Sequence, residues 1–230
     1  MKGLRKNLIY AIKPCLLGLC GPAEKEIKNL ILNFLYGSKI NEEKLIDYSK
    51  QLKSAFTYLK LIAKANKIKN PFDERVVEAY WIGNELLKNV SREKLIEAIR
   101  TDLKLSINEL PDGVLPHHSF HVLFIGSLKN IAPIEKLASK CIINCGMVEK
   151  IEGKHIFIKT RPLVFFNHKA ELGEEIIQEI GFDCKILPKV KVGDTVSYHW
   201  DFACEVLDKQ QAENLTDNLR RNIDFYNSVR

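Results

Sequence analysis

The sequence predicts an α+β protein: an N-terminal helical domain followed by a small antiparallel β-barrel with a C-terminal helix. In the first half, apolar residues recur at the spacing of about 3.6 that is typical of amphipathic helices. From Cys141 onward the apolar spacing changes to about two, which is typical of half-buried strands. We therefore expect a boundary near residues 137–141, with a helical domain over residues 1–138 and a barrel domain over residues 139–230.

Helix start signals divide the first domain. Asn41 is suited to cap a helix, because its side chain can accept a backbone N–H of the first turn. Pro71 fits a first helical turn, and Ser91 is a further capping residue. The expected helices cover residues 23–36, 41–66, 71–89 and 91–104.

At the end of the first domain we expect a loop, a short strand and a short helix in place of long helices. Residues 107–119 carry Pro, Gly and Asp and indicate a loop. The short apolar run "FHVLFIG" predicts a buried strand over residues 120–126. Residues 132–140 then predict a last short helix, with Pro133 near its start.

Alternating residues define the strands expected in the second domain. Residues 146–166 alternate around a turn at Glu152 and Gly153. After a long connection, residues 192–207 predict another strand. Asp208 is a capping residue for the terminal helix, which we expect to run to about Tyr226.

Charge and hydropathy argue against two partner classes. The net charge is +6, from 35 basic and 29 acidic residues, and no block of like charge occurs, so neither nucleic acid nor membrane is expected as a partner. The N-terminal apolar run is interrupted by Lys13 and Pro14, and no run reaches the roughly 18 apolar residues of a membrane span. We expect a soluble, cytoplasmic protein.

Cysteine and histidine supply the candidate metal ligands. The six cysteines are too sparse for a disulfide scaffold, but Cys141 and Cys145 form a C-x3-C pair that can bind a metal. The segment "PHHSFHV" holds His117, His118 and His121, half of the six histidines. Two of these could converge on one ion, or all three could be polar loop residues. Whether they share a site with Cys141 stays open.

Two separated motifs point to a known family. The first is "CIINCGMV", with Cys141, Gly146 and Val148, and the second is "VKVGDTVSYHWDFACEVLD", with Gly193, Asp194, Val196, His199, Phe202 and Ala203. In order and internal spacing they resemble the motifs of the hydrogenase maturation chaperones of the HypC/HupF family. Those chaperones are small β-barrels, and the likeness covers about 90 residues at the C-terminal end.

The resemblance implies iron chemistry and two partners. It implies that Cys141 is an iron ligand with His199 as a functional neighbour, which suits the softness of thiolate and imidazole. It implies binding to a maturation protein of the HypD type and to the hydrogenase large-subunit precursor. Cys145 stands where the family has proline, Asp201 where it has glycine, and Lys140 where it has the initiator methionine.

The whole chain also resembles an uncharacterised prokaryotic family. The segments that carry this likeness include "LGLCGPAE", "VVEAYWIGNELL", "PHHSFHV" and "GDTVSYHW". They add Cys20, Glu78, Trp81, Asp194 and Trp200 as further candidate site residues. Tyr80 and Trp81 also fit a helix core, because large aromatic side chains dominate cores.

Three functions follow as hypotheses. The first is accessory or chaperone work in metallocentre assembly, most simply for [NiFe]-hydrogenase, with iron as the metal or zinc as the alternative. The second is a metal-dependent enzyme with a His/Cys site that acts on an unknown small substrate. The third is an interaction module that binds no metal.

Overall fold

The computed structural model describes residues 2–19, 24–126 and 134–229. The chain divides into two compact units, Met1–His117 and His118–Arg230. The division precedes the expected boundary at residues 137–141, since the helical residues after His118 share a core with the strands. Val122, Leu123, Ala138 and Ile142 belong to one apolar cluster with Leu163, Ala170, Leu219, Ile223 and Tyr226.

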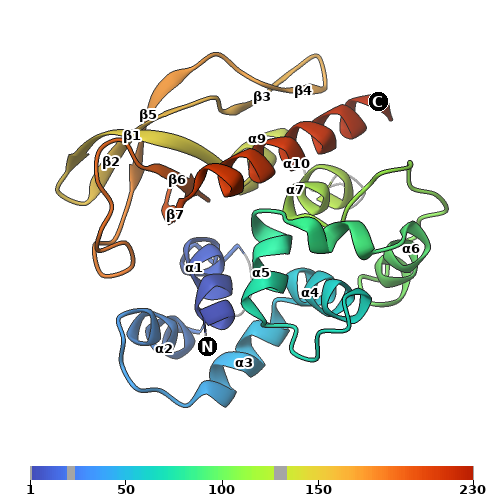
Figure 1. Cartoon of the computed structure of the whole chain (residues 1–230), viewed down its shortest axis with the longest axis horizontal. Helices are drawn as coiled ribbons and strands as arrows, with labels where there is room; N and C mark the ends of the chain where they lie inside the picture. Colours follow the sequence, from blue (N-terminus) through green and yellow to red (C-terminus); the bar gives the residue numbers. More distant parts are fainter. Residues whose placement is uncertain (1, 20–23, 127–133, 230) are drawn as a thin grey trace. The chain divides into compact units, whose positions relative to one another are not determined.

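The first unit is helical, as expected. Its elements are α1 (Lys2–Leu16), α2 (Lys25–Leu35), α3 (Glu42–Gln51), α4 (Lys53–Ala65), α5 (Glu74–Trp81), the 3-10 helix η1 (Glu85–Asn89) and α6 (Arg92–Thr101) (Figure 1). Helix α1 packs against α2 and α5, and α4 packs against α5 and α6. The expected helix over residues 41–66 is broken at Leu52 into α3 and α4.

Aromatic stacking builds the centre of the first unit. Tyr10 of α1 stacks on Trp81 of α5, with ring centroids 5.3 Å apart. Tyr58 of α4 stacks on Tyr80 of α5 at 5.4 Å. All four rings are buried, which confirms the interpretation of Tyr80 and Trp81 as helix core.

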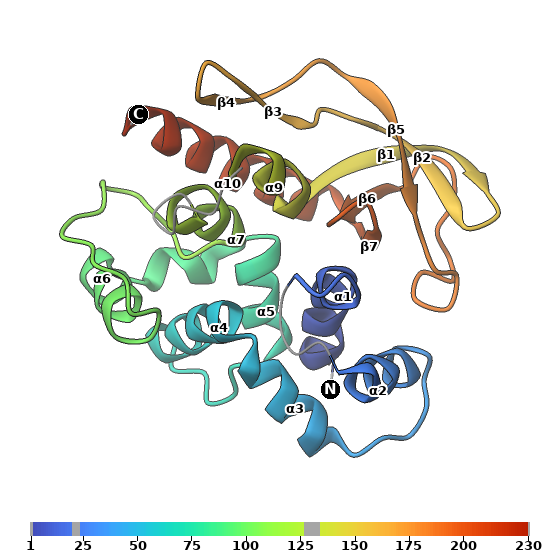
Figure 2. The ribbon, with the colours of Figure 1, turned by 180° about the vertical axis from the view of Figure 1, so that it is seen from behind.

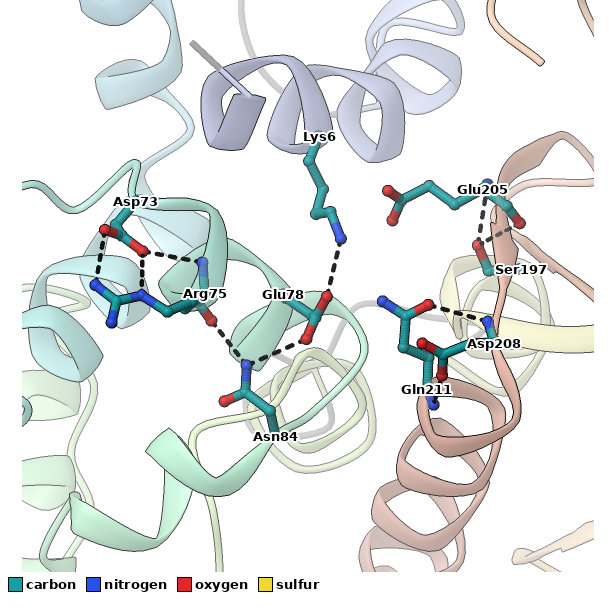
Figure 3. Close-up of polar contacts among 9 residues, drawn as sticks. All are labelled: Lys6, Asp73, Arg75, Glu78, Asn84, Ser197, Glu205, Asp208 and Gln211. Carbon is teal, nitrogen blue, oxygen red and sulfur yellow. Dashed lines mark hydrogen bonds and ion pairs between the residues drawn. The ribbon is translucent and has the colours of Figure 1, made fainter. Parts of the chain in front are cut away.

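The second unit combines helices with antiparallel sheets. Its elements are α7 (His118–Phe120), the π-helix η2 (His121–Ile125), α9 (Ile134–Cys141), β1 (Asn144–Glu152), β2 (His155–Thr160), β3 (Leu163–Phe166), β4 (Lys169–Leu172), β5 (Ile176–Gly181), β6 (Thr195–Tyr198), β7 (Ala203–Leu207) and α10 (Lys209–Ser228). Helix α10 contacts β1, β4, β7 and α7 (Figure 2). Asp208 caps α10, as the sequence indicated, and the structure adds that it does so in a capping box with Gln211 (Figure 3).

The expected antiparallel strands and terminal helix are confirmed, but the strands that the structure describes form no closed barrel. Five strands lie in the order β5-β2-β1-β6-β7, and one isolated bridge between Gly181 and Phe202 joins the two edges at one end. Strands β3 and β4 leave this sheet and pair with each other. Leu163 and Ala170 pack into the apolar cluster beside α10, so those strands are not available to close a barrel.

The expected strand over residues 120–126 is also wrong, because this segment is helical. A short apolar run does not by itself distinguish a buried strand from a buried helix. Phe120 and Phe124 are four residues apart, and their rings stack at 5.4 Å on the same helical face. Both rings also pack against Phe225 of α10, whose ring centroid lies 6.2 Å from that of Phe120 and 4.9 Å from that of Phe124.

The single strand expected over residues 192–207 is a hairpin instead. Strands β6 and β7 pair with each other, and the chain reverses at Trp200 and Asp201. The apolar alternation continues across the reversal, so periodicity alone did not reveal the turn.

Replacing Gly146 with alanine is expected to destabilise the second unit by about 1–3 kcal/mol, the usual range for overpacking. A Cβ at this position in β1 would lie 2.8 Å from the Lys159 carbonyl oxygen and 2.9 Å from Thr160 Cβ. Urea denaturation followed by circular dichroism measures the change. Gly181→Ala is the matched control, because its Cβ would meet only ordinary contacts of 3.6 Å or more. Equal midpoints for the two variants would contradict the prediction.

Candidate metal centre

Three potential metal ligands meet in the second unit. One ligand atom each from His118, Cys141 and His199 lies within 4.8 Å of the other two. Metal bonds of about 2.0–2.3 Å at tetrahedral angles place donors roughly 3.3–3.6 Å apart, so side-chain movements of about 1 Å would bring all three onto one ion. The two imidazoles are buried, at 5% and 2% exposure, and the thiol is half-buried.

Each ligand comes from a different element. His118 is the first residue of α7, Cys141 is the last residue of α9, and His199 follows β6. The two imidazole rings meet edge to face, with centroids 5.2 Å apart at 79°. The group therefore forms only when helices and sheet of the second unit are folded together.

A tight turn presents His199. The His199 N–H donates to the Phe202 carbonyl at 3.0 Å, and the Phe202 N–H donates to the His199 carbonyl at 3.2 Å. Trp200 and Asp201 between them have φ of 54° and 53°. Positive φ at both central residues is the type I′ pattern, which favours Asn and Gly. Trp200 in this conformation indicates local strain, which is often stored at functional sites.

Further bonds connect this turn to the end of α9. The Trp200 N–H donates to the Lys140 carbonyl at 3.0 Å, and the Lys140 ammonium forms an ion pair with the Asp201 carboxylate. Lys140 precedes Cys141, and Trp200 follows His199. Two of the three ligands are therefore held through their immediate neighbours in the chain.

The donor set determines which ions the group suits. Two imidazoles and one thiolate favour Zn²⁺ and other transition ions, including iron, over Mg²⁺ or Ca²⁺, which prefer oxygen ligands. Three protein donors also leave one position of a tetrahedral ion open. The arrangement is suited to bind a transition-metal ion whose fourth position accepts a ligand from outside the protein.

Three other sequence candidates lie in the same unit without joining the group. The Cys145 sulfur is 3.9 Å from the Thr216 hydroxyl, and burial raises the pKa of the Cys145 thiol. The Asp194 carboxylate accepts the Lys191 N–H at 3.0 Å and shapes the turn before β6. Trp200 belongs to the turn that presents His199, with its ring centroid 6.5 Å from the imidazole centroid.

The remaining histidines of the "PHHSFHV" segment have separate environments. His117 is the last residue of the first unit and is fully buried. Burial lowers the pKa of His117 to about 4, although hydrogen bonds to the backbone of Ile82 and Trp81 oppose this shift. His121 begins η2, is half-buried, and is not a member of the metal-ligand group.

The candidates in the first unit have structural contacts. The Glu78 carboxylate lies between Lys6 Nζ at 3.1 Å and Asn84 Nδ2 at 3.4 Å (Figure 3). The Trp81 indole N–H donates to Asn7 Oδ1 at 3.0 Å. These contacts join α1 to α5 and the residues that follow it. Cys20 lies outside the described residues.

Sequence reasoning missed the residues that support the ligands. In the sequence, Lys140 and Asp201 stand out only as departures from the family motif, although opposite charges within two residues of two candidate ligands are a usable signal. Gln178 Nε2 donates to Asp201 Oδ1 at 3.0 Å, and no local pattern in the sequence indicated this contact.

Fold and site together define an α+β protein with a His/Cys group in a C-terminal unit of sheet and helices. The chain belongs to the family described as "Family of unknown function (DUF6390)", whose sequence model matches residues 2–230. This match confirms the likeness of the whole chain to an uncharacterised family. No curated protein and no solved structure matches the chain. Within the described ranges, every helix is too short or too polar to cross a bilayer.

Proposed function

We propose that this protein binds one transition-metal ion through His118, Cys141 and His199 and serves as an accessory protein in metallocentre assembly. The observation that carries the proposal is the approach of the three ligand atoms to within 4.8 Å of one another. The resemblance of the two C-terminal motifs to the HypC/HupF chaperones supports the class of function. Both lines of argument include the same two residues, Cys141 and His199.

The proposed metal is iron, with zinc as the alternative. Thiolate and imidazole bind both ions, so the donor set alone does not separate them. Iron follows from the chaperone resemblance. The fourth position would accept a ligand from a partner, which is the property that a protein needs to pass a metal onward.

The proposed partners also follow from the resemblance. They are a maturation protein of the HypD type and the precursor of the [NiFe]-hydrogenase large subunit. The proposed compartment is the cytoplasm, where the free thiols of Cys141 and Cys145 stay reduced.

A transfer experiment tests the proposal. The protein is prepared without air, loaded with Fe²⁺ or Zn²⁺, and mixed with metal-free large-subunit precursor and the HypD-type protein. We expect about one iron per chain, co-purification with one of the two proteins, and delivery of iron to the precursor. Failure to take up either ion would refute the metal site and favour an interaction module without metal.

A metal-dependent enzyme is the second candidate, and one observation favours it. Three protein ligands with one open position are the arrangement of catalytic zinc sites. The two functions differ in stoichiometry, because an accessory protein releases its ion once and an enzyme turns over repeatedly. Retention of zinc with multiple hydrolytic turnovers of small ester or amide substrates, and no transfer of the ion, would favour the enzyme.

A further inference from the structure

We infer that Lys140 and Asp201 form a clasp that positions Cys141 and His199 for metal binding. The clasp consists of the ion pair between these two side chains and the hydrogen bond from the Trp200 N–H to the Lys140 carbonyl. This inference rests on the proposed metal site. It assigns neither residue to the metal, since Lys140 acts through the adjacent Cys141 and Asp201 acts through the turn that begins at His199.

Asp201 makes most of the contacts that connect the turn to α9 and β5. Its carboxylate receives Lys140 from α9 on one oxygen and Gln178 from β5 on the other, at 3.0 Å. Its backbone carbonyl accepts the Gly181 N–H at 2.9 Å. One residue of the turn is therefore tied both to the helix that ends in Cys141 and to the edge strand β5.

The ion pair holds the turn at Trp200 and Asp201 in place and adds little to the overall stability of the protein. The side chains of Lys140 and Asp201 are 49% and 38% exposed, and exposed ion pairs add little to the free energy of folding. The turn that they hold is strained, because Trp200 has a φ of 54°. Such conformations persist only where surrounding contacts fix them. Release of the Asp201 carboxylate would let the turn relax. His199 is the first residue of that turn, so its imidazole would move.

Conservative substitutions test the effect of the charges while the backbone conformation of the turn is kept. Asp201→Asn keeps a residue that tolerates positive φ and removes the charge that pairs with Lys140. Lys140→Met removes the ammonium and keeps an unbranched side chain that is one atom shorter, and Lys140→Arg keeps a cation. Glu175→Gln is the matched control, because it breaks another exposed pair of the same unit, the 2.7 Å contact with Lys159.

Affinity for Zn²⁺ is measured without air by competition with a chromophoric chelator. We expect Asp201→Asn and Lys140→Met each to weaken binding about tenfold, the lower end of the range for residues that orient metal ligands. The double variant should bind no more weakly than the worse single variant, because both changes break one contact. Lys140→Arg and Glu175→Gln should bind like the original protein.

A second measurement uses the metal-free protein. The Trp200 amide hydrogen should exchange with solvent faster in Asp201→Asn than in the original protein, because its bond to the Lys140 carbonyl is weakened. Faster exchange with unchanged Zn²⁺ affinity would overturn the positioning role, and unchanged exchange would overturn the clasp itself. If the original protein binds neither Zn²⁺ nor Fe²⁺, the proposed function fails and the positioning role fails with it. Lys140→Met tests the clasp independently if Asp201→Asn does not fold.

Discussion

Cys141→Ala is expected to weaken Zn²⁺ or Fe²⁺ binding by more than about 100-fold, beyond the range seen for residues that only orient metal ligands. The substitution removes the one thiolate of the group and leaves two imidazoles. His118→Ala and His199→Ala should each cause a comparable loss. Combining any two should add little further measurable loss, since the ligands of one ion act as a unit and a partial site holds metal poorly.

Titration with Co²⁺ without air checks this expectation, because a bound thiolate gives a charge-transfer band that Cys141→Ala must abolish. Cys184→Ala and His155→Ala are matched controls, since both residues are exposed and lie outside the group. His121→Ala should also leave binding intact, although His121 was a sequence candidate. Full metal content in Cys141→Ala would refute the site, and loss in His121→Ala would require a different ligand set.

Local capping chemistry explains why several helix starts were predictable. The side chains of Asn41 and Ser91 accept backbone N–H groups of their helices, and Asp208 makes the full capping box. These interactions depend only on neighbours in the sequence. The helical character of the first half and the terminal helix were therefore expected correctly.

Elements that depend on distant contacts were not predictable in this way. The helical residues 118–125 pack on Phe225, which lies about 100 residues further along the chain and contacts the rings of Phe120 and Phe124. The open sheet depends on β3 and β4, which pack beside α10 rather than joining the other strands. The hairpin turn at Trp200 contains neither Asn nor Gly, so the usual signal of a type I′ turn was missing.

The candidate site was predictable only in part, for the same reason. Cys141 and His199 were named together by the motif resemblance, and the structure brings them together with His118. Choosing His118 over His117 and His121 required knowledge that a helix begins at His118 and that His117 is buried in the other unit. Spacing within "PHHSFHV" contains neither fact.

Acidification is expected to destabilise the helical unit through His117. Burial lowers the pKa of this imidazole to about 4, against about 6.5 in an unfolded chain. Between these values the unfolded state binds a proton that the folded state does not, so stability falls as the pH falls. The contribution is fully present above about pH 6.5 and is lost as the pH approaches 4. The difference between the two pKa values corresponds to about 3 kcal/mol, since one pH unit is worth about 1.4 kcal/mol.

Urea denaturation at several pH values, with chelator present, measures this loss. The chain has two tryptophans, so a Trp200→Phe background leaves Trp81 as the fluorescent probe of the helical unit. In that background we expect His117→Gln to be less stable at pH 7 than the protein that keeps His117, because the buried hydrogen bonds to Trp81 and Ile82 are altered. The glutamine side chain does not titrate. We therefore expect the stability difference between the two proteins to shrink by about 3 kcal/mol from pH 7 to pH 4. A difference that is constant across this range would show that His117 is accessible to protons in the folded protein, and the buried environment assigned to it would then be wrong.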